Sequence, residues 1–333
     1  MVLVTGGTGF LGAYIIKHLV DKGYAVRALR RETSQLPAFI PAEIVKRVEW
    51  FDGDILDVFS LRDAMEGIDT VIHAAAKVSF QPDHRQEMFQ VNVEGTANVV
   101  NMAIEMNIKK LVHLSSVASL GRTMQGETVN EEKDWDDSFI NTAYAISKHR
   151  GEMEVWRGAG EGLDCVILNP STILGYGDWN NSSSRLFKNV YDEFPYYTNG
   201  MNGFVYVEDV AAAVLALLES GISMQRFIIS SENRTFKQVF DAIADGFNKK
   251  RPSRNATPFL SQVAWRMEKL KSLFTGHTPL LSKETARIAQ TETYFDSSKI
   301  LNALPEFRFT PISEAVNESC VLYLRNLEQQ RSN

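Results

Sequence analysis

An apolar segment at the start of the chain runs directly into a glycine-rich turn, and this junction limits the possible folds more than any other feature. Residues 2–12 read VLVTGGTGFLG, and an amphipathic stretch follows at 13–20. Gly6 allows a sharp turn, Gly9 leaves room for a pyrophosphate, and Gly12 lets the next helix pack closely against the strand. The sequence therefore predicts a strand, a turn and a helix whose N-terminus binds the pyrophosphate of an adenine dinucleotide.

Strand-like and helix-like segments alternate through the first half of the chain. This alternation predicts an α/β fold, a doubly wound parallel Rossmann sheet with helices on both faces. We expect residues 1–170 to form the dinucleotide-binding domain, with 203–231 returning to it, and 171–202 and 232–333 to form a smaller substrate-binding lobe. The expected strands lie at 2–5, 25–29, 48–52, 70–73, 111–115, 165–168 and 227–230, and a further helix at 210–218.

Composition narrows the class of protein. The net charge of −6 gives no support to nucleic-acid or anionic-membrane binding, and no apolar run approaches the ~18 residues that a membrane span requires. Residues 263–274 are amphipathic, and a helix packed on the lobe is favoured over one at a membrane surface. Cys165 and Cys320 suggest packing cysteines and no metal site. With no leader before the first strand, we expect a cytoplasmic protein.

Several motifs follow one another in a fixed order along the chain. The N-terminal glycines come first, and a Tyr144-x-x-x-Lys148 pair follows downstream. The other motifs are Asp52–Ile55, Val71–Ala76, Val91–Thr96, Leu114–Ser116, Asn169–Ser171, Phe204–Val210 and Tyr294–Lys299. In this order they resemble the extended branch of the short-chain dehydrogenase/reductase superfamily, nearest its dihydroflavonol-4-reductase and 3β-hydroxysteroid dehydrogenase group. The resemblance covers nearly the whole chain and implies a cofactor-dependent enzyme that acts on CH–OH and C=O groups.

Tyr144 and Lys148 are four residues apart, so on a helix they share one face. An ammonium beside a phenol is expected to lower the pKa of the phenol toward working pH, where general acid catalysis is efficient. The resemblance implies that Tyr144 protonates a carbonyl oxygen and that Lys148 also holds the nicotinamide ribose. By its offset to Gly121, Ser116 matches the family's catalytic serine, with Ser119 as a weaker competitor.

The resemblance also assigns residues to the cofactor. Asp54 and Ile55 match the pair that holds the adenine, and Pro170 and Ser171 match positions beside the nicotinamide. Asn92 matches an asparagine that supports the catalytic lysine or the cofactor loop, although capping of a helix at 93–106 explains it nearly as well. The remaining expected cofactor contacts, beyond Tyr144 and Lys148, are Gly6, Gly9, Phe10, Leu11, Gly12, Ala74, Ala75 and Ala76.

The end of the second strand bears on the choice of cofactor. An NAD site places a carboxylate there for the ribose hydroxyls, whereas NADP requires a cation for the 2′-phosphate. This chain has Arg30 and Arg31, and a carboxylate appears only afterwards, at Glu32. The guanidinium fork suits a phosphate, so we expect NADP(H) in preference to NAD(H). Two solvated surface arginines are the alternative interpretation.

Three classes of function compete: a carbonyl or alcohol oxidoreductase, a nucleotide-sugar epimerase or dehydratase, and a cofactor-binding protein without catalysis. The intact Tyr/Lys pair disfavours the last. Nucleotide-sugar enzymes of the family carry phosphate-binding arginines where this chain has Asn202, and Arg287 is out of register. We therefore expect an NADP(H)-dependent reductase of a small ketone or aldehyde. Aromatic residues of the lobe are expected to line the site, with part of the cluster in the core: Phe187, Tyr191, Phe194, Tyr196 and Tyr197.

The resemblance finally suggests how two copies of the chain associate. Relatives often pair through helices that correspond here to 93–106 and 144–157. Two such helices from each copy would form a four-helix contact. We expect a homodimer of this kind.

Overall fold

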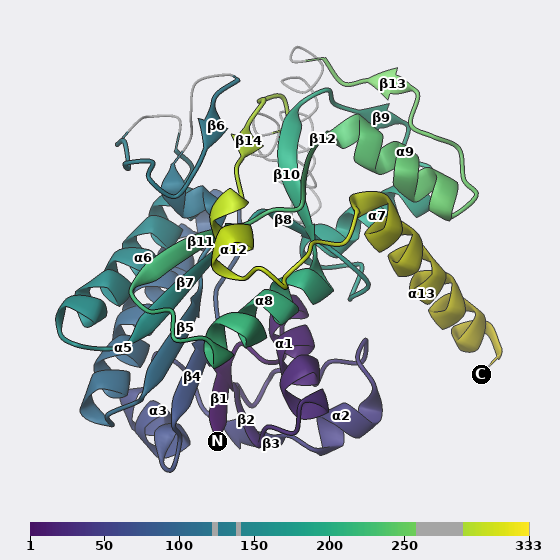
Figure 1. Cartoon of the computed structure of the whole chain (residues 1–333). Helices are drawn as coiled ribbons and strands as arrows, with labels where there is room; N and C mark the ends of the chain where they lie inside the picture. The colour runs from purple at the N-terminus through teal and green to yellow at the C-terminus, as the bar shows by residue number, and fades with distance from the viewer. Residues whose placement is uncertain (122–125, 138–140, 258–288, 333) are drawn as a thin grey trace.

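A parallel sheet of seven strands forms the centre of the molecule (Figure 1). The computed structural model describes residues 1–121, 126–137, 141–257 and 289–332. Strand order is β11-β7-β5-β4-β1-β2-β3, so the order reverses between β1 and β4. The predicted doubly wound α/β fold is confirmed. The strands are β1 Val2–Thr5, β2 Val26–Arg30, β3 Glu49–Asp52, β4 Thr70–His73, β5 Lys110–Leu114, β7 Cys165–Pro170 and β11 Gln225–Ile229.

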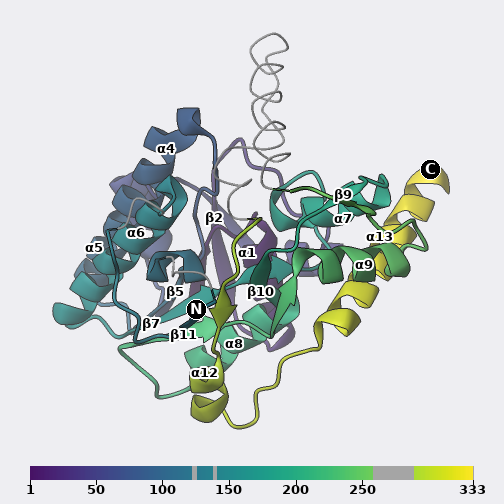
Figure 2. The same ribbon diagram turned by 90° about the horizontal axis from the view of Figure 1, so that it is seen from above.

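Helices cover both faces of this sheet, as Figures 1 and 2 show. Alternate residues of one strand supply the two cores: Val2 and Val4 pack with α1 and α8, whereas Leu3 packs with α3, α5 and α6. Helix α12 adds Ile300 to the first core. The helices of the first face are α1 Phe10–Asp21, α2 Ala42–Lys46, α8 Val207–Glu219 and α12 Ser298–Ala303, and those of the second are α3 Val58–Met65, α5 Gly95–Glu105 and α6 Ala143–Gly160.

A smaller lobe with its own core stands beyond the carboxyl ends of the strands. A three-stranded sheet, in the order β12-β10-β8, packs in it with three helices. Residues 203–206 belong to β10 of this lobe, and the chain then returns to the central sheet through α8 and β11. The elements are β8 Thr172–Leu174, β10 Met201–Tyr206, β12 Glu232–Thr235, α7 Arg185–Tyr191, α9 Phe236–Gly246 and α13 Ile312–Ser332.

Short elements complete the described chain. Strand β9 Tyr196–Tyr197 pairs with β13 Arg254–Asn255, and β6 Thr128–Val129 pairs with β14 Tyr294–Phe295. Helix α4 Arg85–Phe89 continues into a π-helical turn, Gln90–Glu94, that leads into α5. The amphipathic stretch 263–274 and Arg287 lie outside the described residues.

The structure bears on three expectations drawn from composition, which concern the two cysteines, a membrane span and a metal site. Cys165 lies on β7 and Cys320 on α13, both buried and free, and burial raises their pKa values to about 11 and about 12. Within the described ranges no helix combines the length and apolar character that crossing a membrane demands. The same residues contain no group of His, Cys, Asp and Glu side chains arranged to hold a metal ion.

Candidate active site

The glycine turn lies where the strand order reverses, and its backbone requires glycine at two positions. Gly6 has a φ of +74°, and a Cβ there would lie 2.6 Å from the amide nitrogen of Ala75 after β4. A Cβ on Gly12 would lie 2.2 Å from the carbonyl oxygen of Gly6. The turn is therefore pressed against both the neighbouring strand and its own helix. In sheets of this type, ligands bind at the switch point beyond the carboxyl ends of the strands.

The first turn of α1 presents backbone donors on the other side of these glycines. Gly9 is the N-cap residue and provides no side-chain acceptor for the first amide groups of the helix. A Cβ on Gly9 would approach only the oxygen of Gly6, at 3.2 Å, so its outer side is open. Phe10 and Leu11 follow, each half-buried. Open amide groups at a helix N-terminus suit a diphosphate, so these residues fit the phosphates of a dinucleotide cofactor.

The ends of β2 and β3 bring the residues expected near the adenine and its ribose to the same edge. Arg30 donates from Nε to Asp52 Oδ1 at 2.9 Å, whereas Arg31 is exposed just beyond the strand. Asp54 accepts from the amide of Leu56 at 2.9 Å. Ile55 is buried, and its carbonyl accepts from Asn98 Nδ2 at 3.0 Å. The pairing of Arg30 leaves Arg31 better placed to meet a phosphate.

The segment after β4, which contains Ala74, Ala75 and Ala76, is held from two sides. The amide of Ala74 donates to the carbonyl of Thr5 at 3.1 Å. Asn92 Oδ1 accepts from the amide of Lys77 at 2.7 Å, and its Nδ2 donates to Ser147 Oγ on α6 at 3.0 Å.

The interpretation of Asn92 as a helix cap is wrong. Its backbone lies inside the π-helical turn Gln90–Glu94, and its side chain is 3% exposed. Both polar atoms of the amide are used by Lys77 and Ser147, so the residue clamps the segment after β4 to α6.

Tyr144 and Ser116 meet where α6 begins beside the end of β5. The Thr142 hydroxyl caps α6 by accepting from the amide of Ala145 at 3.0 Å, which places Tyr144 in the first turn. The Ser116 hydroxyl accepts from the amide of Ala118 at 3.2 Å and lies near enough to the phenol to lower the pKa of Tyr144. Ser115 and Ser119 instead donate to Glu152. Among the three serines, the geometry thus favours Ser116 as the partner of the phenol.

Lys148 lies one turn further along α6 and is 3% exposed. Its Nζ donates to the carbonyl of Leu114 at 2.9 Å. Burial lowers the pKa of Lys148 to about 8, and the charge of Glu152 opposes that shift.

The expected lowering of the Tyr144 pKa by Lys148 is wrong for this structure. Burial raises the pKa of Tyr144, and the hydrogen bond with Ser116 is what opposes the increase. The ammonium is directed at the Leu114 carbonyl, so desolvation of the phenol dominates.

The end of β7 contributes Pro170 and Ser171 next to these residues. Asn169 Nδ2 donates to the carbonyl of Ser116 at 3.2 Å, which ties this strand end to the serine turn. The hydroxyl of Ser171 is buried and has no hydrogen-bond partner among the described residues. A buried hydroxyl without a partner suits a polar group bound beside it.

Two residues of this region were not found from the sequence. Phe80 packs edge-on against the ring of Tyr144, with centroids 5.6 Å apart. Glu152 is a buried carboxylate on α6, eight residues after Tyr144. Spacing of four and eight residues on one helix could have indicated Glu152, whereas Phe80 lies in a loop that carries no such signal.

The aromatic residues expected in the lobe differ in how deeply they are buried. Phe187 is the member of the aromatic cluster that belongs to the core of the lobe, because its side chain is 0% exposed. Tyr191 packs against Phe247 in the same region, whereas Phe194 is 52% exposed. Tyr196 and Tyr197 are half-buried on β9. Asn202 Nδ2 donates to Thr172 Oγ1 at 2.9 Å, across β10 and β8.

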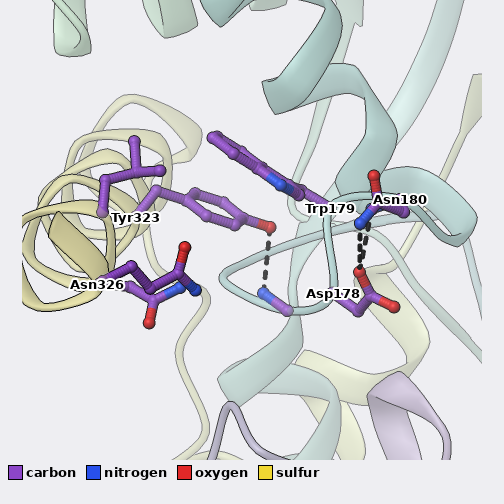
Figure 3. A pocket seen from close by; sticks show the side chains of 8 residues that line it. Asp178, Trp179, Asn180, Tyr323 and Asn326 are labelled. Carbon is purple, nitrogen blue, oxygen red and sulfur yellow. Dashed lines mark hydrogen bonds between the residues drawn. The ribbon is translucent and has the colours of Figure 1, made fainter. Parts of the chain in front are cut away.

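A pocket lies between the loop 177–180 and α13 (Figure 3). Tyr323 Oη accepts from the amide of Gly177 at 3.0 Å, and Trp179 stacks on the Tyr323 ring with centroids 5.3 Å apart. A Cβ on Gly177 would lie 2.7 Å from the ring of Phe10, so this loop reaches the first residue of α1. The lobe therefore contacts the dinucleotide side of the molecule at this loop.

A glycine turn at the switch point, beside a half-buried tyrosine and a buried lysine one helical turn apart, fits an enzyme that uses a nicotinamide dinucleotide. The chain belongs to the NAD dependent epimerase/dehydratase family, because the model of that family matches residues 2–229. It is thus an extended short-chain dehydrogenase/reductase, an NAD(P)-dependent enzyme that acts on CH–OH or C=O groups.

Individual relatives agree with this assignment. "Sterol demethylase protein B" of Methylococcus capsulatus is 32% identical, covering 89% of this chain and 90% of the relative. "Putative dihydroflavonol 4-reductase" of Synechocystis is 30% identical, covering 90% and 88%. A UDP-glucose 4-epimerase of Thermotoga maritima superposes with a TM-score of 0.78 at 18% identity, over 98% of this chain and 99% of that one, and shares the fold.

Proposed function

We propose that this protein is an NADP(H)-dependent reductase of a ketone or aldehyde, with Tyr144 as the proton donor. The observation that carries the proposal is the placement of Tyr144 and Lys148 one turn apart on α6, with Lys148 buried and bonded to the Leu114 carbonyl at the end of β5, and with Ser116 near enough to the phenol to lower its pKa. The similarity to a relative named as a dihydroflavonol reductase supports a reductase. When bound, the nicotinamide cofactor supplies the hydride.

The chain's own residues have distinct roles in this proposal. Tyr144 donates its proton to the carbonyl oxygen, and a pKa raised by burial keeps the phenol protonated until it is needed. Ser116 hydrogen-bonds the same oxygen, and Lys148 would hold the ribose of the nicotinamide. Asn92 maintains the loop after β4 against α6. Ser171 offers its buried hydroxyl to the nicotinamide.

Cofactor preference is expected to depend on Arg31 more than on Arg30, because Asp52 already pairs with Arg30. We expect tighter binding of NADPH than of NADH, and Arg31→Ala should remove a contact of ~1.5–3 kcal/mol, or roughly 10- to 100-fold in Kd for NADPH. Arg30→Ala is the matched control and should have the smaller effect. Fluorescence titration of each variant with both cofactors measures this. Equal affinity of the unmodified protein for the two would refute the NADP(H) assignment.

The substrate is expected to be an uncharged aromatic or alicyclic carbonyl compound. The amide of Asn202 is held by Thr172 and offers no cation for a diphosphate, and desolvating a diphosphate without a cation is costly. UDP and dTDP should therefore bind weakly in calorimetry on the NADP-bound protein, whereas apolar ketones should bind. Micromolar UDP binding that competes with turnover would instead favour a nucleotide-sugar epimerase or dehydratase.

We extend the proposal to organisation in solution and in the cell. The division expected from the sequence moves by four residues, because 203–206 lie in β10 of the lobe: 1–170 and 207–231 form the cofactor part, and 171–206 and 232–333 the substrate lobe. Helices α5 and α6 lie side by side on the outer flank of the sheet (Figure 2), and they would form a four-helix contact in a cytoplasmic homodimer. Light scattering after size exclusion should give twice the chain mass of 37.4 kDa.

A further inference from the structure

Glu152 on α6 is a carboxylate that is 2% exposed and surrounded by donors. Its Oε2 accepts from Ser115 Oγ and Ser119 Oγ, each at 2.6 Å, and from Asn169 Nδ2 at 2.8 Å. Its Oε1 accepts from Arg226 Nη1 at 3.3 Å. Amide nitrogens and guanidinium groups can only donate, so both oxygens of Glu152 act as acceptors, and Arg226 brings a positive charge to the buried carboxyl group. A charge so buried requires this many partners.

The donors around Glu152 determine where Ser116 lies. Ser115 and Ser119 flank Ser116 in the turn after β5, and both hydroxyls bond the same carboxylate oxygen. The third donor, Asn169, also donates to the Ser116 carbonyl at 3.2 Å. Ser116 is thus fixed by both neighbouring serines and at its backbone, while its own hydroxyl accepts from the amide of Ala118 at 3.2 Å and lowers the pKa of Tyr144.

Glu152 also acts on Lys148, which lies one helical turn before it on the same face of α6. The negative charge of Glu152 raises the pKa of Lys148 against the lowering caused by burial. Other elements present further titratable groups. His73 on β4 and His113 on β5 have pKa values lowered by burial, His73 to about 3, so both rings are neutral near neutral pH.

The remaining charged and titratable neighbours are Arg226 and His149. Arg226 on β11 pairs with Glu152, and the pKa of His149 on α6 is lowered by burial. Arg226 carries the same sign of charge as Lys148, so of these neighbours Glu152 is the one whose charge favours the ammonium.

We propose that Glu152 is a positioning residue for the reduction, which fixes the turn that carries Ser116 and electrostatically stabilises the Lys148 ammonium. One carboxylate then controls both groups that flank Tyr144, the serine through hydrogen bonds and the lysine through charge. This inference rests on the proposed roles of Ser116, Tyr144 and Lys148.

The charge effect is tested by titrating Lys148 itself, without substrate. Trace acetic anhydride labels lysines according to their deprotonated fraction, and peptide mass spectrometry gives the midpoint for Lys148 as pH is varied. In Glu152→Gln this midpoint should fall by about 1 pH unit, because the ammonium loses its favourable charge. Glu154→Gln is the matched control, since Glu154 pairs with Arg157 at 2.9 Å on the same helix. In this control the labelling midpoint of Lys148 should not change. A folded Glu152→Gln protein with an unchanged midpoint would overturn the proposal.

Glu152→Asp keeps the carboxylate but shortens the side chain by one methylene group, and it is the more conservative change for folding. It should keep the Lys148 midpoint but lower kcat about 10-fold, because the shorter side chain cannot hold Ser115 and Ser119. A fallen midpoint, or full wild-type turnover, would contradict the inference. If the unmodified protein reduces no carbonyl compound, the proposed function fails, whereas the labelling result still decides whether Glu152 controls Lys148.

Discussion

Replacement of Tyr144 by phenylalanine is expected to lower turnover by ~10²-fold or more while NADPH binding stays nearly unchanged. The substitution removes the transferable proton and keeps the ring. Turnover should therefore decrease because proton transfer is impaired, whereas ground-state binding is retained. The edge-on packing of Phe80 against this ring is retained. Steady-state kinetics on a reduced carbonyl substrate and fluorescence titration with NADPH measure the two effects separately.

The control for this prediction is Tyr24→Phe, which makes the same chemical change at a site on the opposite face of the sheet. Tyr24 Oη donates to Glu219 Oε1 at 3.0 Å and touches none of the proposed catalytic residues. Turnover should stay within about two-fold, as surface hydrogen bonds contribute little. Normal turnover of Tyr144→Phe on an authentic substrate would remove Tyr144 from the mechanism.

Gly12→Ala is expected to damage both stability and cofactor binding. The new Cβ would lie 2.2 Å from the carbonyl oxygen of Gly6, which is backbone and cannot rotate away. Helix α1 must then move from the turn, at an overpacking cost of ~1–3 kcal/mol, and the amide groups at its N-terminus move with it. Denaturant unfolding and NADPH titration should both record the loss.

Gly160→Ala is the matched control, because a Cβ at Gly160 meets no atom within 4 Å. It should leave stability equal or slightly raised, since alanine reduces the entropy of the unfolded chain. Wild-type stability and cofactor affinity in Gly12→Ala would contradict the close packing of the turn against α1.

Much of the fold could be predicted because its determinants are local. The strand before Gly6 and the alternation of apolar segments are readable along the chain, and they gave the parallel sheet. The strand that ends at Leu114 also placed Ser115 and Ser116 at the sheet edge to within one residue. The pair Tyr144 and Lys148 could be found because four residues make one helical turn.

Other parts of the site depend on contacts between distant segments. Asn92 clamps a loop 15 residues earlier to Ser147, 55 residues later, and nothing in its local sequence separates this role from helix capping. The pKa of Tyr144 depends on burial, which no spacing rule gives. The sequence predicts that part of the aromatic cluster is core, but only the packing of α7 identifies Phe187 as the buried member.

The most direct test of the account follows a deuterium atom from the cofactor. Candidate aromatic and alicyclic ketones are incubated with NADPH deuterated at the transferable position of the dihydronicotinamide, and the product is analysed by mass spectrometry and NMR. The account predicts net oxidation of one NADPH for each alcohol formed, deuterium on the carbinol carbon, and both signals reduced by ~10²-fold or more in Tyr144→Phe. Rearrangement of a nucleotide sugar without net NADPH consumption, or an alcohol product without deuterium, would contradict it.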